Sequence, residues 1–206
     1  TVKKAFRGCS SLVYNSSVNN WDLSNTTAID QLFYDNTNFN QPLNNWDVSN
    51  VEAISFLFFN CVNFNQPLNN WDVSSVNLSF TQLFTGASNF NQPLPWDVSG
   101  VTNMTQTFNR ASSFNQDLSW DTTSATSMSQ MFLQATNFDG LLIFNTENVT
   151  DFSYMFQQAN NFNQPLNFDL SSAVDMSFMF QQANAFNQFL DWDTSNIQKM
   201  NSMFRF

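Results

Sequence analysis

The chain reads Phe64-Asn65-Gln66-Pro67-Leu68-Asn69-Asn70-Trp71-Asp72-Val73-Ser74 in the stretch that decides its fold. Twenty-five residues earlier, residues 39–49 have almost the same sequence, and less similar copies continue to the C-terminus. Self-similarity at a fixed period predicts a repeat array, in which each unit buries its apolar face against its neighbours.

A Trp-Asp pair sets the period, with Phe replacing Trp in two units. The spacing is 25 residues in the first half of the chain and 24 in the second. The column contains Trp21, Trp46, Trp71, Trp96, Trp120, Phe144, Phe168 and Trp192. Phenylalanine recurs at the same step, with 25 Phe in the 206 residues. The sequence thus predicts about eight coils of 24–26 residues around a phenylalanine-rich core, forming a single array over 1–206.

Two periodicities alternate within a unit. Leu94, Trp96 and Val98 alternate with polar residues or Pro, and period two predicts a short strand with one buried face. Units with an extra Asn before Trp46 and Trp71 are expected to have a bulge or a widened turn there.

After the strand, apolar residues fall at steps of three and four, which predicts a short α-helix or 3₁₀ segment. In one unit these residues are Val51, Ile54, Leu57, Phe58 and Cys61. Ser49 and Glu52 have capping-box spacing at its start. The fold class expected is an α/β repeat solenoid, leucine-rich-repeat-like, with one short parallel strand and one helical segment in each coil.

Three recurring motifs carry a family resemblance: Asn65-Gln66-Pro67-Leu68, Trp71-Asp72-Val73-Ser74 and endings such as Met131-Phe132-Leu133-Gln134-Ala135. They resemble the BspA-like surface-protein repeats of mycoplasmas, Listeria and lactobacilli. The resemblance covers the whole chain and implies a leucine-rich-repeat-like solenoid, usually on secreted or lipid-anchored proteins suspected of adhesion. It supplies no catalytic residues. The sixth unit departs most from the repeat consensus, because the sequence of 138–145 differs from the usual motifs.

Charge and composition exclude several functions. Six Lys and Arg against sixteen Asp and Glu give a net charge of −10, which repels nucleic acid and anionic membranes. No apolar run approaches the roughly 20 residues that span a bilayer. The absence of His, of a phosphate-binding Gly loop and of a distinct acid pair indicates a protein without catalysis or cofactor. Cys9 and Cys61 fall in one column two coils apart, roughly 10 Å at strand spacing, and are expected to be free thiols.

An aspartate column follows the Trp column. It contains Asp22, Asp47, Asp72, Asp97, Asp121, Asp169 and Asp193. Each carboxylate is expected to accept backbone N–H bonds at the next turn. The alternative is calcium bridging, with Asp47, Asp72, Asp97 and Asp121 as candidate ligands, although Ca²⁺ needs six to eight oxygens.

The Asn-Gln columns and the Trp column have structural interpretations. Amides such as Asn65 and Gln66 both donate and accept, and are expected to form a ladder along the corners of the coils. The Trp rings share the phase of Leu and Val, which places them in the core and argues against a carbohydrate platform.

Candidate partner-contact residues are Leu141, Ile143 and Phe189, which occupy columns that are polar or Pro elsewhere. Apolar residues on a polar face indicate a contact patch. The alternative is repeat drift, with the residues covered by a neighbouring loop.

The function expected is a non-enzymatic repeat scaffold for protein binding or adhesion, extracellular or at the cell surface. The alternative is a structural or linker subunit inside a large intracellular or organellar assembly. Both ends fall inside a repeat, so the segment is expected to belong to a longer array.

Overall fold

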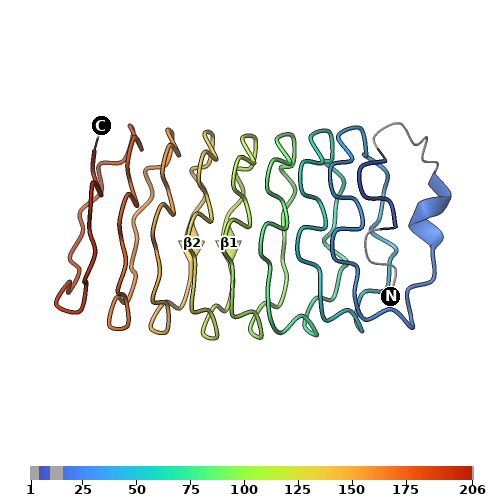
Figure 1. Cartoon of the computed structure of the whole chain (residues 1–206), viewed down its shortest axis with the longest axis horizontal. Helices are drawn as coiled ribbons and strands as arrows, with labels where there is room; N and C mark the ends of the chain where they lie inside the picture. Colours follow the sequence, from blue (N-terminus) through green and yellow to red (C-terminus); the bar gives the residue numbers. More distant parts are fainter. Residues whose placement is uncertain (1–4, 10–15, 206) are drawn as a thin grey trace.

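The computed structural model describes residues 5–9 and 16–205. Successive coils lie side by side along the longest axis, with colours that run from blue at one end of the array to red at the other (Figure 1). The regular elements are a 3₁₀ helix, η1, at Ser16–Asn20 and two strands, β1 at Leu118–Ser119 and β2 at Leu142–Ile143. The strands are parallel, with Leu118 opposite Leu142 and Ser119 opposite Ile143. No helix in the described ranges is long and apolar enough to cross a membrane.

The helical segment expected in each coil is wrong. Its place is taken by consecutive β-turns, which we call the turn ladder: 28–36, 53–61, 79–87, 103–111, 127–135, 151–159 and 175–183. Alternate N–H groups close turns within the coil, as when Leu32 donates to the Ile29 carbonyl at 3.2 Å. The N–H groups between them donate to the next coil, as when Phe33 donates to the Leu57 carbonyl at 3.1 Å.

Backbone dihedrals explain why a helix does not form. Gln31 and Asp35 have φ of 57° and 61°, and the same two columns keep positive φ in later coils, for example at Gln106 and Arg110. A type II turn requires positive φ at its third residue, whereas a right-handed helix excludes it. The capping box also fails, because the Ser49 hydroxyl donates to Asp47 Oδ1 at 2.6 Å.

The period-two segment alternates as expected but is only partly a strand. Leu94, Trp96 and Val98 are buried, and Pro95 and Asp97 between them are exposed. Among the described residues, however, the only period-two segments that pair as strands are β1 and β2. The other parallel bridges, such as Ser79 with Asn103, are isolated and lie in the turn ladder, so a paired strand in every coil is wrong.

Side-chain chemistry competes with strand pairing in the other coils. The Trp96 indole N–H bonds the Leu68 carbonyl at 3.0 Å, and Pro93 and Pro95 have no N–H to give. The widened turn is confirmed, because the N–H of Trp46 donates to the Leu43 carbonyl at 3.0 Å across the extra Asn.

Aromatic stacks form the core, as predicted. Phe58 lies on Phe84 with ring centroids 5.4 Å apart, and this column continues at similar spacing to Phe204. The Phe64 ring packs against the Phe58 ring with centroids 4.1 Å apart. Phe64 belongs to a second stack, in which its neighbour is Phe90. Cys9 and Cys61 are free, as expected, and burial raises the pKa of the Cys61 thiol.

Candidate contact surface

The aspartate column is exposed, and each carboxylate is held by its own turn. Asp47 Oδ1 accepts the backbone N–H of Ser49 at 3.1 Å and its hydroxyl at 2.6 Å. The corresponding N–H bond occurs at Asp22, Asp72, Asp97, Asp121, Asp169 and Asp193. This Asx-turn geometry is the structural role expected for the column.

The turn bonds also set the ionisation of these carboxylates. The hydroxyl and backbone N–H of Ser49 lower the pKa of Asp47, against a smaller opposing effect of the Asp22 carboxylate one coil away. Thr123 lowers the pKa of Asp121 in the same way, with Asp97 opposing. A lowered pKa keeps a carboxylate ionised at neutral pH, and this applies to Asp22, Asp47, Asp97, Asp121, Asp169 and Asp193.

The calcium candidates Asp47, Asp72, Asp97 and Asp121 lie one per coil in the aspartate column. Within 5–9 and 16–205, no three His, Cys, Asp or Glu side chains come together in a group able to hold a metal ion. Calcium bridging between coils stays a prediction, for which a titration is given in the Discussion.

The candidates Leu141 and Ile143 flank the buried Leu142 at β2. Leu141 is 44% exposed and Ile143 66% exposed, and Phe189 reaches 85%. No described loop covers them, and their role as partner contacts stays a prediction. Phe189 occupies the same column as Leu141 two coils further along, with the exposed Pro165 in the coil between them.

Gly140 allows β2 to come this close to the preceding coil. A Cβ at Gly140 would collide with the carbonyl oxygen of Gln116. The N–H of Leu141 then donates to Asp117 Oδ1 at 2.8 Å, and Ser119 pairs with Ile143. The divergent sequence of the sixth unit thus brings β2 close to the preceding coil, with the side chains of Leu141 and Ile143 pointing outward.

A hollow of about 540 Å³ adjoins these residues. Its lining includes Pro93, Pro95, Asp97, Asp117, Ser119 and Asp121, and contains no basic side chain. Because Asp117 and Ser119 also contact the strand that carries Leu141 and Ile143, the hollow and the apolar pair form one surface. We call Leu141, Ile143 and this hollow the contact surface.

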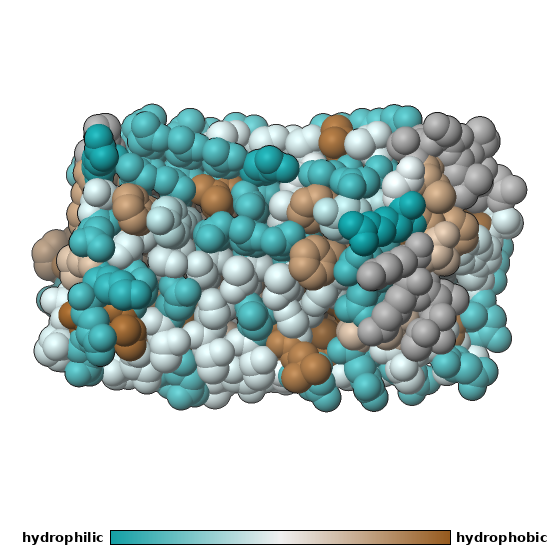
Figure 2. Space-filling view, viewed as in Figure 1, coloured by the Kyte–Doolittle hydropathy of each residue, from teal (hydrophilic) through white to brown (hydrophobic). Residues whose placement is uncertain are grey.

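On the face shown in Figure 2, hydrophobic residues appear as small separate patches among hydrophilic ones. The contact surface combines two exposed aliphatic side chains with a hollow that has carboxylates and no basic residue in its lining.

Comparison with known families places the chain in one group. Its sequence matches the family described as "Mycoplasma protein of unknown function, DUF285" over residues 1–119, 78–143 and 119–206. The chain belongs to this family. No curated protein and no solved structure matches the chain. Three overlapping matches fit the internal repeats, and membership of DUF285 supports the broad resemblance to a mycoplasma repeat family.

Sequence reasoning missed one feature of this DUF285 chain, a polar groove on the turn ladder. It is lined by Gln134, Gln158, Gln182 and neighbouring residues. The recurrence of Gln one residue before the small residues Ala135, Ala159 and Ala183 was the available signal. It was hidden because a helical interpretation of this segment does not align these side chains on one open face.

Proposed function

We propose that this chain is a leucine-rich-repeat-like solenoid of the BspA-like surface type. In this proposal it acts without catalysis, as an extracellular or cell-surface scaffold that binds a protein partner in adhesion or recognition. The whole-chain match to a mycoplasma repeat family and the recurring motifs support the proposal.

The observation that carries the proposal is the exposure of Leu141 and Ile143 where other coils have polar residues or Pro. Burying one large aliphatic side chain against a partner contributes roughly 1.5–3 kcal/mol. Exposed aliphatic residues beside a hollow provide the apolar centre that protein interfaces use, and the carboxylates of Asp97, Asp117 and Asp121 provide a polar rim.

The aromatic core supports a binding role because it makes the contact surface rigid. The Phe108, Phe132 and Phe156 rings stack at 5.5–5.6 Å directly through the coils that bear the surface. A rigid surface loses little conformational entropy when it binds, so more of the contact energy appears as affinity.

The experiment measures saturable binding of fluorescently labelled protein to cultured epithelial monolayers. Leu141→Ser/Ile143→Ser is expected to weaken binding strongly. The matched control is Leu78→Ser, which removes an equally exposed leucine, 65% accessible, from a different part of the chain.

Two outcomes would count against the proposal. Equal binding by wild type and Leu141→Ser/Ile143→Ser would show that this surface is not the contact. Absence of saturable binding, together with recovery of the native protein from the cell interior in a large complex, would favour the structural-subunit alternative.

A further inference from the structure

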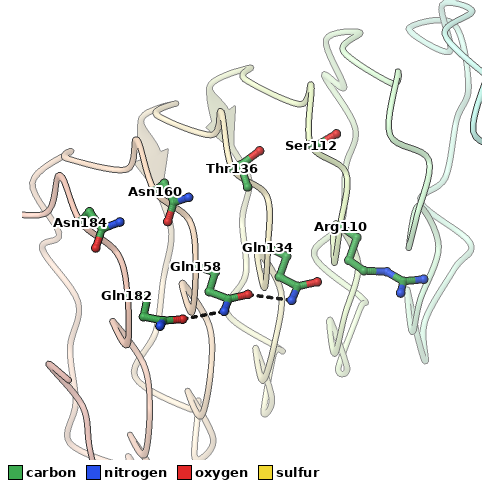
Figure 3. A pocket seen from close by; sticks show the side chains of 8 residues that line it. All are labelled: Arg110, Ser112, Gln134, Thr136, Gln158, Asn160, Gln182 and Asn184. Atoms are coloured by element: carbon green, nitrogen blue, oxygen red, sulfur yellow. Dashed lines mark hydrogen bonds between the residues drawn. The ribbon is translucent and has the colours of Figure 1, made fainter. Parts of the chain in front are cut away.

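The turn ladder carries an open groove of about 540 Å³ that spans four coils (Figure 3). One row of its lining is Arg110, Gln134, Gln158 and Gln182. A second, parallel row is Ser112, Thr136, Asn160 and Asn184. We call this feature the amide groove. Every lining side chain is polar, and the coils of Gln158 and Gln182 each present an amide in both rows.

The first row is ordered but not saturated. Gln134 donates to Gln158 Oε1 at 2.7 Å, and Gln158 donates to Gln182 Oε1 at 2.6 Å. A primary amide has two N–H donors and an oxygen with two lone pairs. Gln158 therefore keeps one donor and one acceptor position for a ligand, while the ladder fixes its orientation.

The second row has still more hydrogen-bonding groups available to a ligand. Asn160 and Asn184 are exposed, and their side chains make no hydrogen bond to another described residue. Figure 3 shows both amides on the same side of the coils as the Gln row. Two lines of donors and acceptors, of which the Gln row is held by its own hydrogen bonds, match a ligand whose own polar groups repeat along an extended chain.

The backbone argues against an extended peptide. The N–H groups of Arg110, Gln134 and Gln158 already bond carbonyls of the next coil at 2.7–2.9 Å. Peptides that add to a sheet gain affinity from free backbone groups and specificity from side-chain pockets. The amide groove has neither an open backbone edge nor an apolar pocket in its lining.

Charge argues for a neutral ligand. The lining contains no carboxylate, and Arg110 is its single charged residue, at one end. The net charge of −10 opposes the approach of a polyanion. Hydroxyl groups, which donate and accept without charge, are the ligand chemistry that fits.

The groove continues past Arg110. A second hollow of about 330 Å³ shares Arg110 and Gln134 with it and is also lined by Phe59, Gln106 and Asn109. Asn109 is 8% exposed, and its Oδ1 has no hydrogen-bond partner among the described residues. The second hollow therefore extends the groove beyond Arg110, over further polar residues such as Gln106 and Asn109.

An aromatic surface lies at this end. Phe59 is partly exposed and stacks on Tyr34 with centroids 4.4 Å apart. Sugar rings present apolar C–H groups beside their hydroxyls, and aromatic side chains suit such amphipathic partners.

From these observations we infer that the amide groove binds a neutral linear polysaccharide, held by its hydroxyl groups along the two amide rows. This site lies on the turn ladder and does not depend on the contact surface at Leu141 and Ile143.

The test is affinity electrophoresis of the purified chain in gels containing dextran, pullulan, galactomannan or hydroxyethyl cellulose, with polygalacturonate as the anionic comparison. At least one neutral polymer is expected to retard the protein. The principal variant is Asn160→Ala/Asn184→Ala, which removes two exposed amides that play no part in the Gln ladder. Its dissociation constant is expected to rise by about tenfold, because two hydrogen bonds are lost.

Two controls separate groove binding from other effects. Gln66→Ala removes an amide that donates to Asn40 at 3.0 Å in a different ladder, and should leave retardation unchanged. Leu141→Ser/Ile143→Ser should also bind as wild type does, so the contact surface can fail without affecting this result.

The inference is overturned if none of the neutral polymers retards the protein, or if only polygalacturonate does. Retardation of Asn160→Ala/Asn184→Ala equal to that of wild type, with both melting at the same temperature, overturns it as well.

Discussion

The indole N–H of Trp71 donates a hydrogen bond to the carbonyl oxygen of Leu43 in the preceding coil, at 2.9 Å. The ring itself stacks between Trp46 and Trp96 at 6.1 and 6.2 Å. One side chain therefore joins three coils, by packing and by satisfying a buried backbone acceptor. The same bond recurs at Trp46, Trp96 and Trp120 at 2.7–3.0 Å.

Replacing Trp71 by Phe separates the two contributions. Trp71→Phe keeps an aromatic ring in the stack but removes one of the two donors to the Leu43 carbonyl, which still accepts the backbone N–H of Trp46. Loss of this one hydrogen bond is expected to cost about 0.5–1.5 kcal/mol. Trp71→Ala also creates a cavity, and about 3–5 kcal/mol is expected. Urea unfolding followed by circular dichroism measures both. If Trp71→Phe unfolds at the wild-type urea concentration, the indole hydrogen bond contributes nothing to stability.

Acid should destabilise the protein through the aspartate column. Turn hydrogen bonds lower the folded-state pKa of Asp47, Asp97 and Asp121. A lowered pKa means that the folded state binds protons less readily than the unfolded state. The resulting stability is complete above the unfolded pKa of about 4 and is lost as pH falls through the folded pKa.

The matched variant is Asp47→Asn/Asp97→Asn/Asp121→Asn, because an Asn oxygen can still accept the turn N–H but does not titrate. Asn145 occupies this column naturally. Melting temperatures measured from pH 7 down to about pH 2.5 should fall less for the variant than for wild type. Parallel curves would show that other carboxylates control the acid response.

The two halves of a coil differ in how well the sequence predicts them. The corner and the period-two segment could be predicted, and the turn ladder could not. The corner ladder followed from sequence, because Asn65 and Gln66 recur at the coil period, and both bond Asn40 Oδ1 at 3.0 Å. The inward Trp column followed from its phase with Leu and Val. Side-chain alternation is a local property, so one sequence reveals it.

The turn ladder could not be predicted, because helices and consecutive turns both produce apolar steps of three and four. The difference lies in the destination of each N–H, and Phe33 donates to a carbonyl 24 residues away. Glycine would have signalled the positive φ, yet the second positive-φ column has Gly86 in one coil and Arg110 or Gln134 in others. The outward position of Leu141 and Ile143 was predicted because they break a column, whereas the hollow beside them and the amide groove required the coil geometry.

Calcium titration tests the alternative for the aspartate column. Millimolar Ca²⁺ is expected to leave the melting temperature unchanged, because Asp97 and Asp121 each use one oxygen in a turn and Ca²⁺ requires six to eight oxygens. A ligand that binds only the folded state raises the melting temperature. A rise with Ca²⁺ but not with Mg²⁺, absent from Asp97→Asn/Asp121→Asn, would establish bridging between coils.

Substitution of Gly140, which precedes the contact surface, should lower the stability of the protein. Gly140→Ala drives a Cβ into the Gln116 carbonyl, and overpacking of this kind costs roughly 1–3 kcal/mol. At the matched control Gly100→Ala, the nearest atom to the new Cβ is the Val76 carbonyl oxygen at 3.3 Å, so a smaller loss is expected. Urea unfolding gives the two costs. Because β2 must shift to relieve the clash, Gly140→Ala should also weaken binding to epithelial monolayers, although Leu141 and Ile143 are unchanged. Wild-type stability and binding in Gly140→Ala would show that the close approach of β2 to Gln116 does not position the contact surface.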